Sequence, residues 1–108
     1  MKLKSTEKGK YTILEIEGRI DTSNYESFAE EVQSFVNEGK KFLVMEMSKL
    51  EYISSSGLRV FLSTLKTLRA IEGDVALCCL NDKIKNVFEV SGFLTLFGSF
   101  EDSDSITD

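Results

Sequence analysis

Two short apolar runs constrain the fold of this chain more than any other sequence feature. They cover Phe42 to Met47 and Val75 to Leu80, and each is nearly continuous. Continuous runs of this length are typical of interior strands that are covered on both faces of a sheet. Between the two runs, apolar residues recur at helical spacing from Leu58 to Leu68. Strands that alternate with helices pair in parallel through right-handed crossovers, so the pattern predicts an α/β fold.

Further strands and helices are expected on either side of this unit. An opening hairpin makes one edge of the sheet antiparallel, which predicts a mixed, mostly parallel sheet. Ser23 to Glu26 has the pattern of a capping box, so Ser23 is expected to cap the first helix and Gly39 to end it. The other expected elements are strands over Lys2 to Glu7, Tyr11 to Glu17 and Leu94 to Phe100, a helix capped by Asn81 or Asp82 that ends at Gly92, and a tail over Glu101 to Asp108 that frays or forms a short helix.

The composition limits the class of protein. The chain has 108 residues, which predicts one domain over residues 1–108, and its 42% of hydrophobic residues suffices for a folded core. A net charge of -5 leaves no basic surplus for binding nucleic acid or an anionic membrane. No stretch is apolar enough to span a bilayer, and the first residues lack the apolar core of a signal peptide. The expected location is therefore the cytoplasm.

Catalysis and metal binding find little support in the sequence. The chain has no histidine, which removes the commonest general base and zinc ligand. Ser63 and Lys66 match the S-x-x-K spacing of serine acyl-enzymes, but they share the polar side of an amphipathic helix and the companion motifs are absent. There is no glycine-rich phosphate loop and no metal-binding carboxylate loop. We therefore expect no enzyme activity, no catalytic residue, no bound metal and no cofactor.

The two cysteines, Cys78 and Cys79, are adjacent in the second apolar run. Adjacent residues are a poor pair for an ordinary disulfide, so both are expected to be reduced, half-buried thiols. Alternation along a strand predicts that their side chains point to opposite faces of the sheet.

Three consecutive serines, Ser54, Ser55 and Ser56, are closed by Gly57 at a predicted strand-to-helix turn. Unpaired N–H groups and the positive end of the helix dipole favour an anion at such a helix start. One interpretation is structural, because one hydroxyl can cap the helix while the others satisfy nearby backbone groups. The other is a phosphorylation switch, since a phosphate on one serine would change the charge of the surrounding surface. The residues alone leave both interpretations open.

Asp21 is the second candidate, because it follows a predicted strand and precedes the first helix. Loops after parallel strands gather at one end of an α/β sheet. The strand before Asp21 belongs to the hairpin, so the sequence leaves open whether Asp21 and Ser55 share one surface. The alternative is an aspartate that only shapes the entry into the helix.

Three segments together resemble the STAS domain, and specifically the bacterial anti-sigma factor antagonists. Gly18 to Asp21 is similar to the family's G-x-[IL]-D loop, Leu50 to Leu58 to its strand-to-helix phosphorylation loop, and Val87 to Phe93 to its closing helix. Their order and spacing agree with the family over nearly the full chain. The resemblance implies a single STAS-like α/β domain with a sheet of four to five strands and helices mainly on one face.

The resemblance also implies a function. The family phosphorylates the serine that follows its motif aspartate; this position corresponds to Ser55, and Ser56 is the rival site. Ser54 stands where many members have the aspartate, so the negative charge beside the acceptor is absent here. In the family, the unphosphorylated antagonist binds an anti-sigma factor that is also a serine kinase, and thereby frees the sigma factor. Phosphorylation by that kinase ends the binding, and a PP2C-like phosphatase restores it.

By the same resemblance, the expected partners are an anti-sigma factor serine kinase and a PP2C-like phosphatase. The residues expected to form the partner surface are Asp21, Ser54, Ser55, Ser56, Gly57 and Arg59. Two alternatives remain. One is a STAS interaction module that acts without phosphorylation, and the other is a STAS protein that binds a nucleotide or another ligand.

Overall fold

The computed structural model describes residues 1–106 of the chain. Within this range it has six strands, three α-helices and two short 3-10 helices. The strands are β1 (Lys2–Lys8), β2 (Tyr11–Ile20), β3 (Phe42–Glu46), β4 (Leu50–Ile53), β5 (Asp74–Cys78) and β6 (Gly98–Phe100). The helices are α1 (Tyr25–Asn37), α2 (Ser55–Arg69), α3 (Asp82–Val90), η1 (Leu94–Leu96) and η2 (Ser103–Ser105). No helix in this range is long and apolar enough to cross a membrane.

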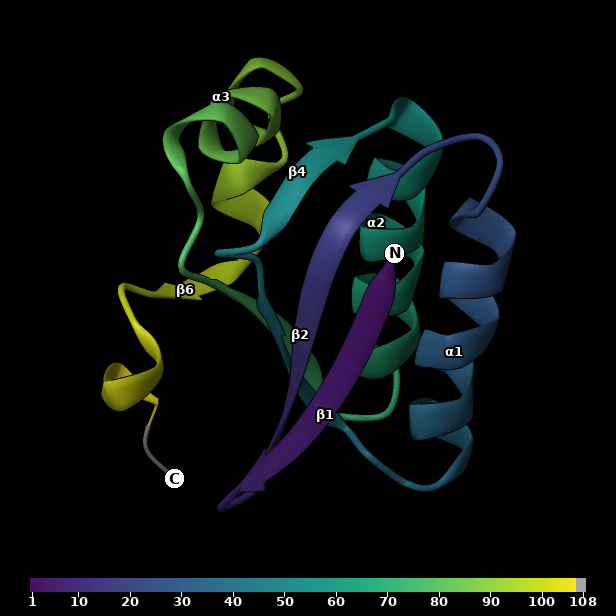
Figure 1. The fold of residues 1–108 in the computed structure, drawn as a ribbon. Coiled ribbons are helices and arrows are strands. Elements are labelled where there is room, and N and C mark those ends of the chain that lie inside the picture. Colours follow the sequence, from purple (N-terminus) through teal and green to yellow (C-terminus); the bar gives the residue numbers. More distant parts are fainter. Residues whose placement is uncertain (107–108) are drawn as a thin grey trace.

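The strands form one sheet in the order β1-β2-β3-β5-β6, with β4 beside the end of β2 (Figure 1). β1 and β2 pair antiparallel and the other pairs are parallel, so the mixed, mostly parallel α/β class is confirmed. The two apolar runs form β3 and β5 in the interior of the sheet, as predicted. The sheet has one strand more than the expected four to five. The additional strand is β4, which pairs with β2 beyond a register shift between Gly18 and Arg19.

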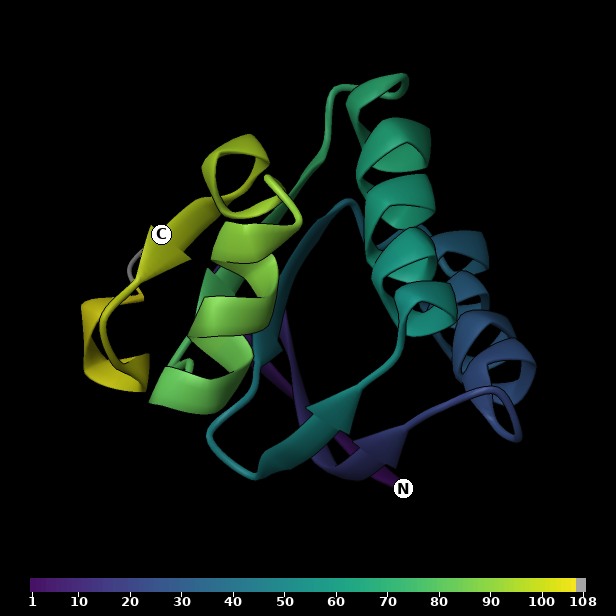
Figure 2. The ribbon, with the colours of Figure 1, turned by 90° about the horizontal axis from the view of Figure 1, so that it is seen from above.

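All three α-helices pack on one face of the sheet (Figure 2). The apolar stripe of α2 faces the strands, and Phe61 at its centre is fully buried. The centre of the Phe61 ring lies 5.7 Å from that of Phe28 in α1 and 5.6 Å from that of Phe88 in α3. Aromatic pairs at such distances stabilise a core beyond the apolar area that they bury. One aromatic cluster therefore joins the three helices above the sheet.

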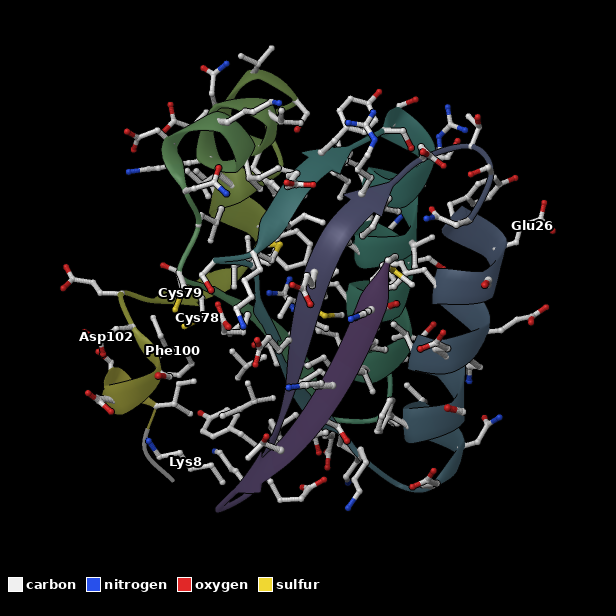
Figure 3. All side chains as sticks on the ribbon, viewed as in Figure 1. Lys8, Glu26, Cys78, Cys79, Phe100 and Asp102 are labelled. Atoms are coloured by element: carbon white, nitrogen blue, oxygen red, sulfur yellow. The ribbon has the colours of Figure 1, made fainter. Side chains whose placement is uncertain are left out.

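The C-terminal segment covers part of the opposite face of the sheet (Figure 3). Ile106 is fully buried against Val44 of β3 and Cys78 of β5. Lys8 Nζ donates a hydrogen bond to the carbonyl of Ser103 at 2.9 Å, which connects β1 to this segment. Of the two outcomes expected for the tail, the structure has the short helix, η2. The last two positions of the tail lie outside the described residues.

The two cysteines do not point to opposite faces of the sheet, so that prediction is wrong. β5 ends at Cys78, and Cys79 has a left-handed backbone conformation with φ of 63°. Strand alternation no longer applies at Cys79, and the two Sγ atoms lie 2.7 Å apart on the face that Phe100 covers (Figure 3). Both cysteines are free thiols. Burial raises the pKa of each.

The helix ends agree with the sequence except at the start of α1. Asn24 is the N-cap residue of α1, and no side chain caps this helix. The hydroxyl of Ser23 donates to the carboxylate of Asp21 instead, so the predicted capping box is wrong. Gly39, with φ of 91°, follows the C-cap and ends α1 as predicted. Asn81 caps α3 with its side chain, which is one of the two predicted positions.

Candidate functional site

The candidate site lies where β2 and β4 end side by side (Figure 1). The two strands run parallel, and their last paired residues are Ile20 and Ile53. The N–H of Ser54 donates a hydrogen bond to the carbonyl of Ile20 at 2.9 Å. The loop that carries Asp21 and the turn that carries Ser55 therefore leave the sheet at the same end. This placement resolves the geometry that the sequence leaves open.

The three serines of the turn have different environments. Ser54 caps α2, because its Oγ accepts a hydrogen bond from the N–H of Gly57 at 3.2 Å. Ser55 is the first residue of α2 and is exposed. Ser56 is half-buried and lines a cleft of about 280 Å³ between α1 and α2. Ser55 is therefore the most exposed of the three serines.

Gly57 supports the turn from beneath instead of offering a contact surface. It is buried, and a Cβ atom at this position would lie 2.8 Å from both Ile20 Cγ2 and Ile53 Cγ1. Carbon atoms do not pack so closely without displacement. The glycine therefore lets the first turn of α2 lie directly on the ends of β2 and β4, which fixes the position of the serines.

Asp21 is ionised at neutral pH and is held by Ser23. Its Oδ1 accepts hydrogen bonds from the hydroxyl of Ser23 and, at 3.0 Å, from the backbone N–H of Ser23. These two interactions lower the pKa of Asp21 below its usual value, and the charge of Arg19 contributes further. The carboxylate thus adds a fixed negative charge to the end of the sheet that carries Ser55.

Asn24 is a positioning residue that the sequence analysis missed. Its Oδ1 accepts from the N–H of Asp21 at 2.9 Å, and its Nδ2 donates to the carbonyl of Arg19 at 2.8 Å. Asn24 therefore closes the loop between β2 and α1 on both sides of Ile20. The only sequence signal was an Asn three residues after the Asp, which resembles a helix cap and was interpreted as part of one.

Two arginines lie near the turn. Arg59 is exposed on α2, one helical turn beyond Ser55. Arg19 Cζ lies 4.4 Å from the centre of the Tyr52 ring, which is a cation–π contact between β2 and β4. Sequence reasoning did not identify Arg19 or Tyr52 as site residues, because their contact depends on the register of the two strands.

Within residues 1–106 the site offers hydrogen-bond donors and a cation, and no metal-binding cluster. Residues 1–106 contain no group of three or more histidine, cysteine or carboxylate side chains that could hold a metal ion. The first N–H groups of α2 and the guanidinium of Arg59 can both stabilise a phosphate on Ser55.

The profile of the STAS domain matches residues 2–106. The chain belongs to the STAS domain family. The match includes all six strands and three α-helices that the structure describes in residues 1–106.

A curated relative narrows this membership. This STAS domain is 39% identical over 82 residues to BtrV of Bordetella bronchiseptica, which is named as a candidate anti-sigma factor antagonist. The match covers 76% of this chain and 71% of BtrV. Within the STAS family, the chain therefore belongs to the bacterial anti-sigma factor antagonists.

Solved structures agree on the fold. A candidate anti-sigma factor antagonist of Thermotoga maritima has a TM-score of 0.88 at 21% identity, over 94% of this chain and 88% of that chain. The phosphorylated form of SpoIIAA from Bacillus has a TM-score of 0.72 at 16% identity, over 95% of each chain. At these identities, the likeness establishes the fold of the STAS domain alone.

Proposed function

We propose that this protein is an anti-sigma factor antagonist that acts by partner switching. Unphosphorylated, it binds an anti-sigma factor that is also a serine kinase. Phosphorylation of Ser55 by that kinase ends the binding, and a PP2C-like phosphatase restores it. The exposed hydroxyl of Ser55 at the first residue of α2, in a member of the antagonist family, carries the proposal. The proposed partner surface consists of Asp21, Ser54, Ser55, Ser56 and Arg59, and the buried Gly57 supports it from beneath.

Charge explains why phosphorylation of Ser55 ends binding. A phosphoserine adds about -1.5 to -2 charges, and the carboxylate of Asp21 is already negative at this end of the sheet. Binding requires that the surface lose its water, which is unfavourable for an unpaired phosphate. The partner's own bound ATP phosphates repel it as well. A coupling of about 1–3 kcal/mol, or a roughly 5–150-fold loss of affinity, is typical of such effects.

The environments of the serines favour Ser55 as the acceptor. The hydroxyl of Ser54 is engaged in capping α2, and Ser56 faces the cleft between α1 and α2. A phosphate on Ser55 lies near the unpaired N–H groups of the helix start, and Arg59 follows one turn later. The helix can therefore hold the phosphorylated form without unfolding.

In this scheme the chain is a substrate and supplies no cofactor. The hydroxyl oxygen of Ser55 attacks the γ-phosphorus of the kinase-bound ATP, the bond to the β-phosphate oxygen breaks, and ADP leaves. The hydroxyl proton passes to a base of the kinase. The sigma factors that such a switch serves act in the cytoplasm, which is where we place the protein.

Ser54 favours a second candidate function, a STAS module that binds its partner without phosphorylation. Ser54 stands where many relatives carry an aspartate, yet both residue types cap helices well. The substitution therefore preserves the turn and removes one negative charge beside Ser55. A kinase that recognises that charge would phosphorylate this chain poorly, while binding would persist.

The experiment uses the cognate anti-sigma factor kinase, with ATP and magnesium. The wild-type chain should bind it and gain one phosphate. Ser55→Ala should bind and gain none, whereas Ser56→Ala should still gain one phosphate. Binding without phosphate on any serine of the turn would establish the unregulated module. Absence of binding by the wild-type chain would refute both functions, and a titration with GTP and ATP would then test ligand binding.

A further inference from the structure

Arg19 and Tyr52 form a stack on the outer face of the sheet, beside the proposed partner surface. They are cross-strand partners in the β2–β4 pair, next to Ile20 and Ile53, which face the core. Alternation along each strand places Arg19 and Tyr52 on the opposite face of the sheet. The register shift between Gly18 and Arg19 sets Arg19 directly opposite Tyr52.

The position of the stack connects it to the switch. Arg19 lies two residues before Asp21, and Tyr52 lies two residues before Ser54. The stack therefore lies at the same end of β2 and β4 as Asp21 and the serine turn, within reach of a partner that covers them. Tyr52 is 36% exposed, and Met1, another exposed apolar residue, lies against Gly18 on the neighbouring strand. Exposed aromatic area next to a charged site is characteristic of an interface.

The stack is also chemically incomplete as it stands. Arg19 takes part in none of the three ion pairs within residues 1–106. Its Cζ lies over the Tyr52 ring, and the guanidinium N–H groups can still donate to a carboxylate. Asn24 fixes the backbone of Arg19, because its Nδ2 donates a hydrogen bond of 2.8 Å to the carbonyl of Arg19. The arginine is therefore positioned before any partner arrives.

We propose that Arg19 and Tyr52 anchor the anti-sigma factor kinase on this protein. The Tyr52 ring packs into an apolar recess of the kinase, and the guanidinium edge of Arg19 binds a carboxylate beside that recess. The inference rests on the proposed function and adds a contact outside the serine turn. Tyrosine and arginine are enriched among the residues that dominate binding energy, and a preformed stack loses little side-chain entropy on binding.

The test measures the affinity of the same kinase, without ATP, for four variants by calorimetry. Tyr52→Ala and Arg19→Gln should each weaken binding by about thirtyfold, the effect of removing a dominant interface residue. Tyr52→Phe keeps the ring and should bind like the wild type. Ile71→Ala is the matched control, because Ile71 is 45% exposed and lies beyond the opposite end of α2 from Ser55.

The outcomes separate this inference from the proposed function. The anchor would be overturned, and the switch left intact, if Arg19→Gln and Tyr52→Phe bound the kinase like the wild type and Tyr52→Ala lost binding only because it unfolded. The melting temperature of each variant identifies that case. Equal losses in Ile71→Ala and Tyr52→Ala would also overturn it, since the effect would not be local. No binding by the wild-type chain would overturn the proposed function and the anchor with it.

Discussion

At the scale of single residues, Asp21 and Ser23 determine the charge at the edge of the partner surface. The two hydrogen bonds from Ser23 favour the ionised carboxylate and lower the pKa of Asp21 below its usual value of about 3.9. The folded pKa is thus lower than the unfolded one. The interaction therefore stabilises the fold above about pH 4, and the stabilisation is lost as pH falls through the folded pKa.

Ser23→Ala should raise the pKa of Asp21 toward its usual value, because the hydroxyl that contributes most to the shift is removed. The backbone N–H of Ala at position 23 can still donate, so the change should be partial. A titration of the Asp21 carboxyl carbon by NMR measures it. Thr22→Ala removes a neighbouring exposed hydroxyl and should leave this pKa unchanged. An identical Asp21 pKa in the wild-type chain and Ser23→Ala would contradict the assignment.

The thiols of Cys78 and Cys79 should react slowly with iodoacetamide in the folded protein near neutral pH. Burial raises the pKa of both, so the folded chain holds less thiolate than the unfolded chain, whose thiols have pKa values of about 8.5. Above about pH 8.5 the unfolded thiols ionise more readily than the folded ones, so stability should decline as pH rises. Mass spectrometry of alkylation with and without urea checks the first point. Equal rates in both conditions would show that the thiols are accessible.

At the scale of elements, the start of α2 depends on the absence of a side chain at Gly57. Gly57→Ala should destabilise the protein, although alanine is the better helix former by at most about 1 kcal/mol. The added methyl group meets two isoleucine side chains at 2.8 Å, and overpacking of this kind costs about 1–3 kcal/mol. Urea unfolding should give a lower midpoint.

Ser63→Ala is the control for Gly57→Ala, since Ser63 is exposed on the same helix. It changes helix propensity without adding a buried group, so its midpoint should stay the same or rise. A midpoint for Gly57→Ala at or above that of the wild type would show that the first turn of α2 is not packed as described.

The elements that the sequence predicts well are those with a strong hydrophobic period. The runs that become β3 and β5 are continuous because both faces of these strands are covered. The hydrophobic pattern does not predict β4, because two of its four residues, Glu51 and Tyr52, are exposed and the strand contains no apolar run. The capping box at Ser23 fails for a different reason. Other local hydrogen bonds compete with it, from the hydroxyl of Ser23 to Asp21 and between Asn24 and the backbone of Asp21 and Arg19.

Part of the candidate site can also be predicted from the sequence, and part of it depends on the folded structure. Ser55 and Asp21 are recognisable from motifs, and parallel strands bring them to one end of the sheet. The stack of Arg19 on Tyr52 depends on a register shift that leaves no signature in the sequence. The burial of Gly57 and the cleft beside Ser56 likewise depend on how the helices pack on the strands.

At the scale of the whole molecule, the fold separates stability from switching. The helices cover one face of the sheet, the C-terminal segment covers part of the other, and the serine turn lies at the end of β2 and β4 (Figures 1 and 2). A phosphate on Ser55 changes the charge of this end and leaves both cores untouched. We therefore expect phosphorylated and unphosphorylated chains to share one fold and to differ in their affinity for the partner.

The most direct test of this account compares the affinity of the anti-sigma factor kinase for two forms of the chain. One form is unmodified, and the other carries phosphoserine at position 55, installed during synthesis so that no kinase reaction is needed. The phosphorylated form should bind about 5–150-fold more weakly at an unchanged melting temperature. A chain with phosphoserine at position 34, which is exposed in the last turn of α1, should bind like the unmodified one. Equal affinities of the unmodified chain and the chain phosphorylated at Ser55 would contradict the account.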